Sequence, residues 1–355
     1  MNLRDLTNSI ELKVSKEAEE YSEFVKNKNN SLIDRLEVFE DIINIEVGDT
    51  GLMRAKSLER DYNLRQLFLK TEGDNPTGTQ KDRIAFAQVY DALRREYDTI
   101  SLATCGNYGS ALALAAHLAG IECKIFIPES YHTARIEEMV DLGSEINRLK
   151  GSYEDSVTES SLMAQEHEWY DANPGGANTP LQIIAYSQIA FEIYDQLRDA
   201  PRICAVPISN GTLLAGIYRG FVSLHKRGKT SRVPLMLGAS SVHKNPIVYS
   251  FNKGLDHCVD LKPEMIKETK FNEPLINWHS FDGEEALYAI RESNGMAYNV
   301  SDSEMKSMSK YLLSKESKSI LPASTAGLIG LLKEHEKNEM EPDRYVAILT
   351  AKNSK

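Results

Sequence analysis

Hydrophobic and polar residues change their pattern at about residue 64 of this 355-residue chain. Residues 1–45 are polar with helical periodicity and a break at 27–31, which we interpret as an N-terminal extension. Beyond residue 64, short apolar runs alternate with longer helical runs. The apolar runs predict strands at residues 67–69, 99–103, 124–127, 203–208, 235–239 and 346–349. The helical runs predict helices at residues 83–97, 110–119, 133–142, 153–168, 186–198, 213–226, 302–314 and 324–336.

Strands that are apolar on both faces and separated by helices indicate parallel α/β sheets. The chain is long enough for two domains of about 100 to 200 residues each, so two such sheets are expected rather than one. Residues 240–280 have mixed polarity and scattered prolines. We expect that stretch to form irregular surface connections.

Composition and charge exclude several functional classes. The chain is 41% hydrophobic and 26% charged, as is typical of a globular protein in water. Its formal net charge of −11 argues against nucleic acid or an anionic membrane as a partner. Residues 1–23 contain no apolar segment, which argues against a secretory signal or a membrane anchor. We therefore expect a cytoplasmic protein.

The cysteines and histidines do not predict a metal site. The cysteines are widely spaced, without a CxxC pair: Cys105, Cys123, Cys204 and Cys258. This pattern argues against both a zinc site and a disulfide framework. The His-Glu pairs at 167–168 and 335–336 lack the second histidine that completes a zinc-binding helix face. No metal is expected.

One nonapeptide stands out, Asn75-Pro-Thr-Gly-Thr-Gln-Lys-Asp-Arg83. Its first four residues predict a turn, and the residues after Lys81 begin a helical run. Lys81 is therefore expected at the N-terminus of a helix, where a cation opposes the helix dipole and needs another reason to be present. The pattern favours a lysine that binds a ligand covalently over a lysine that is only solvated.

Ligands of open α/β sheets bind at the carboxyl ends of the strands, so the loops that follow the apolar runs are informative. In the loop at 104–110, Gly106 and Gly109 permit close backbone approach, and Asn107 offers both a donor and an acceptor. The loop at 209–213 places small polar residues before a helix, which favours binding of an anion such as phosphate. Thr350 places a hydroxyl after the last strand.

Other interpretations of these loops are weaker. Residues 106–109 lack the full GxGxxG of a dinucleotide-binding loop. Residues 73–78 have the first spacing of a nucleotide-binding P-loop, but Thr79 stands where that motif needs its lysine. Turns without any ligand explain one of the three loops adequately and all three poorly.

Together these segments resemble the fold type II pyridoxal-phosphate enzymes, and within them the threonine synthase group. Asn75–Arg83 is similar to that group's NPTGSFKDR lysine motif. Residues 105–110, CGNYGS, resemble its SGNTGAS loop, and residues 206–221 resemble VPVGNGGNISAYWRGF. Residues 321–327, LPASTAG, resemble EPASAAG. The resemblance runs in order from about residue 48 to residue 350.

The resemblance implies roles for individual residues. Lys81 is implied as the Schiff-base lysine and catalytic base, and a closed, partly apolar site lowers the pKa of such an amine. Asn107 is implied as the partner of the cofactor's ring hydroxyl, and Thr350 as the group facing the pyridine nitrogen. The phosphate is implied to bind at Ser209, Asn210, Gly211, Thr212 and Leu213. The substrate side is implied to include Thr104, Gly106, Tyr108, Gly109 and Gln182.

The resemblance also implies the domain organisation and the assembly. It places pyridoxal 5'-phosphate in the cleft between two open parallel-type α/β domains. The large domain comprises residues 1–83 and 179–355, including the extension at 1–45. The small, mobile domain comprises residues 84–178. A homodimer is implied.

The implied activity is elimination or replacement on an amino acid in amino-acid biosynthesis, with O-phosphohomoserine and water giving threonine and phosphate. Gln182 stands near the place of an arginine in the family's NPxR segment. Glutamine supplies neither a charge nor a bidentate fork for a substrate phosphate. An alternative is therefore β-replacement or β-elimination on a serine, O-phosphoserine or O-acetylserine type of substrate. A non-catalytic relative is a third interpretation, against which the presence of Lys81 argues.

Overall fold

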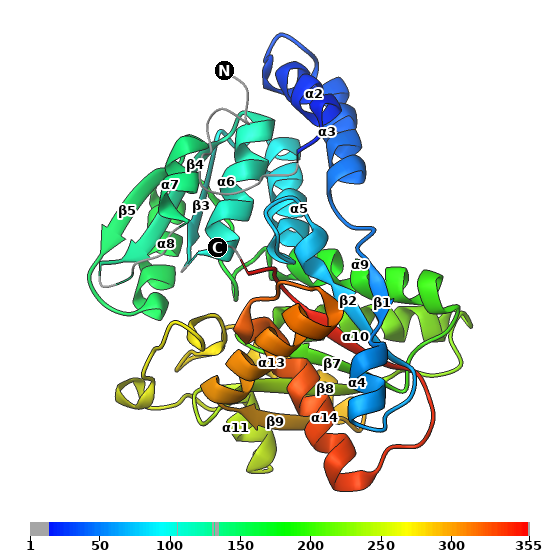
Figure 1. Ribbon diagram of the computed structural model, residues 1–355. Helices are drawn as coiled ribbons and strands as arrows, with labels where there is room; N and C mark the ends of the chain where they lie inside the picture. The colour runs from blue at the N-terminus through cyan, green and yellow to red at the C-terminus, as the bar shows by residue number, and fades with distance from the viewer. Residues whose placement is uncertain (1–13, 105, 130, 132–134, 354–355) are drawn as a thin grey trace. The chain divides into compact units, whose positions relative to one another are not determined.

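The computed structural model describes residues 14–104, 106–129, 131 and 135–353 (Figure 1). Their packing divides the chain into two compact units. The first unit comprises residues 1–48 and 75–182, and the second comprises residues 49–74 and 183–355. The chain therefore passes between the units after residues 48, 74 and 182.

The first unit is built on a four-stranded parallel sheet in the order β5-β4-β3-β6. Its strands are β3 (Thr99–Ala103), β4 (Glu122–Pro128), β5 (Glu145–Leu149) and β6 (Tyr170–Asp171). Its helices are α5 (Lys81–Arg94), α6 (Asn107–Ala119), α7 (Ile136–Asp141) and α8 (Tyr153–Glu166). β3 is buried along its whole length, and α6 is rich in alanine and buried at most positions. Such central elements read as continuous apolar runs in the sequence.

Two N-terminal helices also belong to the first unit, α2 (Lys16–Lys26) and α3 (Leu32–Glu46). Ser15 and Ser31 cap their N-termini, which accounts for the predicted break near residues 27–31. α2 packs against α6 and α3 against α5, with the rings of Phe39 and Phe86 stacked at 6.2 Å. Residues 14–48 therefore pack with residues 84–178, the stretch predicted to form the small domain, and belong to a different unit from residues 183–355. The mobility of that domain stays a prediction.

The second unit contains a six-stranded sheet in the order β1-β2-β10-β7-β8-β9, parallel except for the β1–β2 pair. Its strands are β1 (Leu52–Arg54), β2 (Leu67–Thr71), β7 (Ile203–Pro207), β8 (Leu235–Ser241), β9 (Met296–Val300) and β10 (Tyr345–Leu349). Its helices are α4 (Lys56–Asp61), α10 (Thr212–Lys226), α11 (Pro246–Asn252), α12 (Gly283–Glu292), α13 (Asp302–Glu316) and α14 (Ala326–Asn338). The described residues of this unit also form short 3-10 helices: η1 (Glu72–Asp74), η2 (Pro263–Met265), η3 (Glu273–Leu275) and η4 (Pro322–Thr325). Helix α9 (Thr179–Leu197) begins in the first unit and continues into the second.

The prediction of two largely parallel α/β sheets is confirmed, and each of the six predicted strands is present. The strands that were missed are β1, β5, β6 and β9. β1, β5 and β9 carry exposed or half-buried positions, and β6 has only two residues. They lie at sheet edges, where alternating or polar sequences do not form an apolar run. A search for apolar runs therefore finds the centre of a sheet and misses its edges.

The prediction of irregular structure throughout residues 240–280 was wrong in part. α11 begins after Asn245, whose side chain accepts hydrogen bonds from the backbone N–H groups of Ile247 and Val248. Pro246 occupies its first position, which is a favoured place for proline in a helix. The helix is only seven residues long, so its apolar periodicity is too short to identify.

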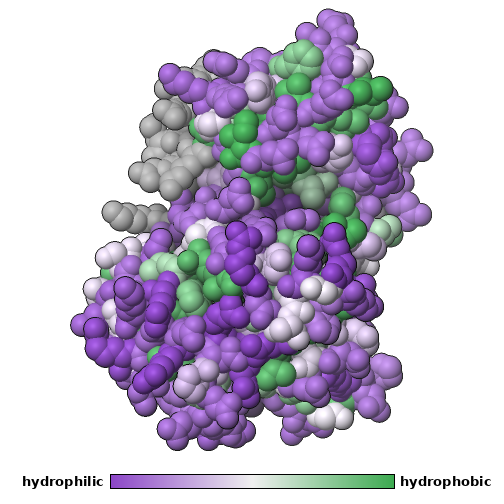
Figure 2. Space-filling view, turned by 90° about the vertical axis from the view of Figure 1, so that its right-hand side faces the viewer, coloured by the Kyte–Doolittle hydropathy of each residue, from purple (hydrophilic) through white to green (hydrophobic). Residues whose placement is uncertain are grey.

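Surface and core are distinct throughout the described residues. The face in Figure 2 is mostly hydrophilic, with hydrophobic residues in separate groups.

Among the described residues, no helix is both long and apolar enough to cross a membrane. The same residues contain no group of three or more histidine, cysteine or acidic side chains placed to hold a metal ion. Cys123, Cys204 and Cys258 are free thiols, and Cys105 lies outside the described residues.

Candidate functional site

The nonapeptide forms a tight turn that ends in the first residue of α5, as the sequence predicts. The N–H of Gly78 donates to the carbonyl of Asn75 at 2.9 Å, which closes a turn with Pro76 in its second position. Gly78 has φ +79°, a conformation that favours glycine. The amide oxygen of Asn75 also accepts from the N–H of Gly48 at 3.0 Å. Lys81 is the first residue of α5 and is half-buried.

Asp82, the next residue, folds back over the turn. Its carboxylate accepts from the N–H of Thr77 at 3.0 Å and from the Thr77 hydroxyl at 2.9 Å. Asp82 is fully buried, and this burial raises its pKa to about 7, although the bonds from Thr77 and the charge of Arg135 oppose the rise. The carboxylate therefore fixes the turn that presents Lys81.

The ammonium group of Lys81 lies over the ring of Tyr108, 5.2 Å from the ring centroid. Tyr108 is buried, and its hydroxyl donates to the carbonyl of Ala172 at 3.1 Å. The amide of Gln88 donates to the same hydroxyl. The polar end of Tyr108 is therefore held inside the first unit, while its aromatic face is turned to the lysine, an arrangement that favours a cation.

The loop at residues 104–109 follows β3 and leads into α6. The hydroxyl of Thr104 accepts from the N–H groups of Gly106 and Gly109, both at 3.2 Å. A Cβ atom on Gly109 would lie 2.6 Å from the Thr104 side chain, so any other residue there would force neighbouring side chains to move. Thr104 thus shapes the loop that carries Asn107, the first residue of α6. Cys105 lies outside the described residues.

Gln182 is almost completely buried, at 1% exposure. Its amide NH2 donates to the carbonyls of Ala172 and Asn173, both at 3.2 Å. Gln182 and Tyr108 therefore bond to the same carbonyl, that of Ala172. In the first unit the structure brings Lys81 to the ring of Tyr108, the residue after Asn107, and anchors Gln182 to the carbonyl that Tyr108 also binds.

Arg135 is a residue of this site that the sequence did not reveal. It lies directly before α7, with its side chain 8% exposed. Its guanidinium donates to the amide oxygen of Asn107 at 2.8 Å and to the carbonyl of Thr77 at 2.9 Å. It also pairs with the fully buried carboxylate of Glu138 at 2.9 Å. No sequence motif marks Arg135, because its partners Asn107 and Thr77 are 28 and 58 residues away along the chain.

The loop at residues 209–213 connects β7 to α10 in the second unit. Gly211 is the N-terminal cap of α10, with φ +105°, and no side chain caps the helix there. The N–H groups of the first helical turn, from Thr212 onwards, are the donors that an α-helix leaves without intrahelical partners. The N-terminus of α10 therefore has the geometry and the partial positive charge that suit an anion.

Side chains from distant parts of the second unit support this loop. The amide of Asn245 donates to the carbonyl of Ser209 at 2.9 Å, and Asn277 donates to the side chain of Asn210 at 3.0 Å. Asp282 accepts a hydrogen bond from the Thr212 hydroxyl. The three supporting side chains lie 36, 67 and 70 residues from their partners. Sequence reasoning missed them because all three lie in or just after the stretch expected to be irregular.

Thr350 lies directly after β10 and is 9% exposed. Its hydroxyl lies 2.7 Å from the hydroxyl of Ser324, which also accepts from the N–H of Ala351 at 3.0 Å. Ser324 belongs to η4, within the segment that resembles the family motif EPASAAG. The pairing fixes the hydroxyl of Thr350 at the carboxyl end of its strand.

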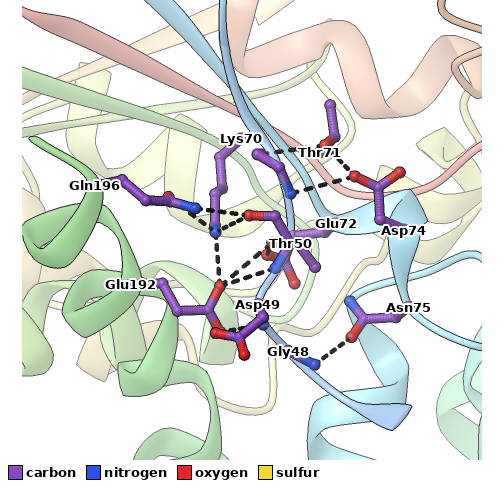
Figure 3. A network of polar contacts seen from close by, with 11 residues as sticks. Gly48, Asp49, Thr50, Lys70, Thr71, Glu72, Asp74, Asn75, Glu192 and Gln196 are labelled. Atoms are coloured by element: carbon purple, nitrogen blue, oxygen red, sulfur yellow. Dashed lines mark hydrogen bonds and ion pairs between the residues drawn. The ribbon is translucent and has the colours of Figure 1, made fainter. Parts of the chain in front are cut away.

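A buried lysine in β2 organises the segment before the nonapeptide (Figure 3). Lys70 is completely buried, and its ammonium group donates to the carbonyl of Thr50 at 2.7 Å and to Glu192 at 2.6 Å. A third bond, to Gln196, measures 3.3 Å. Glu192 also accepts from the N–H groups of Asp49 and Thr50. Lys70 thus ties residues 49–50 to helix α9 within the second unit.

Comparison with known proteins identifies the family of the chain. The family model described as "Pyridoxal-phosphate dependent enzyme" matches residues 43–351. Threonine synthase of Methanocaldococcus jannaschii is 29% identical over 313 residues, which cover 87% of this chain and 75% of that protein. Threonine synthase of Synechocystis is 27% identical over 299 residues, covering 83% and 74% respectively.

Solved structures share the fold at lower identity. Maize serine racemase superposes with a TM-score of 0.74 and 20% identity, covering 91% of this chain and 94% of that one. Threonine deaminase isoform 2 from Solanum lycopersicum gives a TM-score of 0.71 and 18% identity, with 90% of each chain covered. The match of the family model over most of the chain shows that this protein belongs to the pyridoxal-phosphate-dependent enzymes.

Proposed function

We propose that this enzyme catalyses elimination or replacement on a small amino-acid substrate, with the conversion of O-phosphohomoserine and water to threonine and phosphate as the leading candidate. The observation that carries the proposal is the placement of Lys81. It begins α5 at the end of a turn closed by Asp82, opposite the face of a buried tyrosine. The matches to threonine synthases at 27–29% identity support the reaction type.

The residues present fit the cofactor. The uncapped N-terminus of α10 offers backbone donors to a phosphate group. A Cβ atom at Gly211 would lie 2.7 Å from the carbonyl oxygen of Asp282, so this turn accepts only a glycine without rearrangement. In the first unit, Lys81 offers an amine and Asn107 offers an amide. We propose that these groups and the Thr350 hydroxyl bind one molecule of pyridoxal 5'-phosphate.

In the proposed mechanism, Lys81 would hold the cofactor covalently and, once released from it, would accept the proton from Cα of the substrate. When bound, the cofactor spreads the negative charge that proton removal leaves at Cα. Asn107 would stabilise the ring oxygen by a hydrogen bond, and residues 209–213 would bind the phosphate. The hydroxyl of Thr350 would interact with the ring nitrogen without a formal charge, which would favour elimination or replacement over transamination.

One observation favours a second candidate. Gln182 carries no charge, and its amide NH2 is bonded to the backbone carbonyls of Ala172 and Asn173. It therefore supplies no cation for the phosphate of O-phosphohomoserine. The second candidate is β-replacement or β-elimination on a serine, O-phosphoserine or O-acetylserine type of substrate.

Spectroscopy tests the proposed role of Lys81. The purified protein should be yellow after incubation with pyridoxal phosphate, and Lys81→Ala should lose the yellow band. Lys56→Ala is a matched control, because Lys56 also occupies the first position of a helix but is exposed. Protein that takes up no cofactor, or a Lys81→Ala variant that keeps the yellow band, would refute the proposal.

Substrate assays separate the two reactions. O-Phosphohomoserine should yield phosphate and threonine in equal amounts if the first candidate is correct. If only O-phosphoserine or O-acetylserine changes the spectrum of the bound cofactor and releases its leaving group, the second candidate is correct. Activity with neither class of substrate would remove both.

We further propose that the enzyme is a cytoplasmic homodimer. Free thiols at three cysteines are compatible with a reducing compartment. Large apolar side chains are exposed on α2 and α3, at Phe24, Ile33 and Ile45, and are candidates for a subunit contact. Light scattering on the purified protein measures the oligomeric state, and a monomer at micromolar concentration would contradict the dimer.

A further inference from the structure

The guanidinium of Arg135 joins three parts of the first unit. It donates to Asn107 at the start of α6, to Glu138 in α7, and to Thr77 in residues 75–80, which precede Lys81 and are called the lysine loop below. The Arg135 and Glu138 side chains are 8% and 0% exposed. Bonds from an ionised donor inside a protein are among the stronger hydrogen bonds and fix the geometry of their acceptors.

The contact with Asn107 determines the orientation of its amide. A guanidinium carries only donors, so the atom of Asn107 that faces Nη1 at 2.8 Å must be the carboxamide oxygen. The NH2 group is then the end of Asn107 that remains to donate. We propose that Arg135 is a positioning residue, which holds the Asn107 amide with its NH2 group available to the ionised ring oxygen of the cofactor. This inference rests on the proposed function.

The second contact of Arg135 is with the backbone of the lysine loop. Arg135 binds the carbonyl of Thr77 at 2.9 Å, while Asp82 binds the N–H and hydroxyl of Thr77. Thr77 is therefore held on both sides, four residues before Lys81. A single side chain thus contacts both the loop that bears the amine and the amide of Asn107, while Asp82 also holds that loop.

Glu138 explains how a buried arginine is tolerated here and determines how it should be replaced. Its carboxylate accepts from Nε at 2.9 Å and from Nη2 at 3.2 Å. Removal of Arg135 alone would leave a buried carboxylate without this partner, which is strongly destabilising. The double variant Arg135→Met/Glu138→Leu removes both charges together, and such replacements are often close to neutral in stability.

The test is a cycle of variants read by cofactor titration and by the absorption spectrum. Arg135→Met/Glu138→Leu should raise the half-saturating concentration of pyridoxal phosphate about tenfold, as expected for one lost hydrogen bond to a charged acceptor. It should also move absorbance from the yellow band to the near-ultraviolet, because the ring oxygen is less stabilised in its ionised form. Asn107→Ala should give the same two changes. Combining Asn107→Ala with the Arg135 and Glu138 substitutions should weaken binding about tenfold rather than about a hundredfold. The reason is that Arg135 and Asn107 act on the cofactor through the same hydrogen bond.

Two further variants complete the design. Arg135→Lys keeps the buried positive charge but cannot bond Asn107, Thr77 and Glu138 together, so it should shift the spectrum in the same direction. Arg148→Met removes an exposed arginine of the same unit and should leave the spectrum unchanged.

The inference is overturned if the Arg135 and Glu138 substitutions weaken binding about tenfold even when Asn107 is alanine. It is also overturned if they leave the spectrum unchanged while Asn107→Ala alters it. A wild-type protein that takes up no pyridoxal phosphate would instead overturn the proposed function, and this inference with it.

Discussion

Gly211→Ala tests the most constrained position of the proposed phosphate site. Gly211 has φ +105°, which costs an alanine about 1–2 kcal/mol. The added Cβ atom would lie 2.7 Å from the Asp282 carbonyl oxygen and 2.8 Å from the Ala286 Cβ atom. Overpacking of this kind costs a further ~1–3 kcal/mol. The total expected loss in the free energy of unfolding is therefore about 2–5 kcal/mol.

Gly228→Ala is the matched control, because Gly228 lies just beyond the other end of α10. Its φ is +67°, but a Cβ atom there meets nothing within 4 Å. Alanine at this position should therefore cost only the conformational term of about 1–2 kcal/mol. Urea denaturation of both apoproteins measures the difference, and titration with pyridoxal phosphate measures binding, which Gly211→Ala alone should weaken at least about tenfold.

Two results would refute this reasoning. Equal stability of the two variants, within about 0.5 kcal/mol, would show that Gly211 is not as closely packed as the distances indicate. A Gly211→Ala protein that is less stable but binds pyridoxal phosphate as tightly as the wild type would show that the loop at 209–213 does not bind the cofactor phosphate.

The remaining predictions concern buried charges. Burial raises the pKa of Asp82 from 3.8 to about 7, so its contribution to folding is fully present below about pH 4 and is lost as the pH rises through 7. Wild-type apoprotein should therefore lose up to about 4 kcal/mol relative to Asp82→Asn between pH 4 and pH 8 in urea denaturation, and a constant difference would contradict this. Lys70→Met should destabilise the protein by about 3–5 kcal/mol, because Glu192 loses its buried partner. Lys70→Met/Glu192→Gln should recover much of that loss in the same assay, and a double variant as unstable as the single one would refute the pairing.

The sequence predicted the central strands and the lysine loop well because their determinants are local. β3 is five consecutive buried residues, and the turn at residues 75–78 depends on a proline and a glycine within four positions. The start of α5 follows directly from that turn. The edge strands were missed, since β5 pairs with one neighbour only and carries charged residues that local pattern does not distinguish from a loop.

The candidate site shows the same difference between residues recognised from local sequence and residues placed by distant contacts. Lys81, Asn107, residues 209–213 and Thr350 were found because each follows a strand or a turn that can be recognised in the sequence. Arg135 was not found, and neither were the groups that support the loop at 209–213. Their contacts with Asn107 and with residues 209–212 span 28 or more residues of chain, and an arginine or asparagine in a loop has no distinctive local pattern.

By itself, the sequence therefore determined the fold class, the cofactor family and the lysine that is expected to carry the chemistry, because short runs of residues specify turns, helix starts and buried strands. Only the tertiary structure decided the direction of the Asn107 amide, the raised pKa of Asp82 and the burial of Lys70. The physical reason is that orientation, desolvation and ion pairing depend on groups brought together from distant positions, and these are set by packing rather than by local sequence.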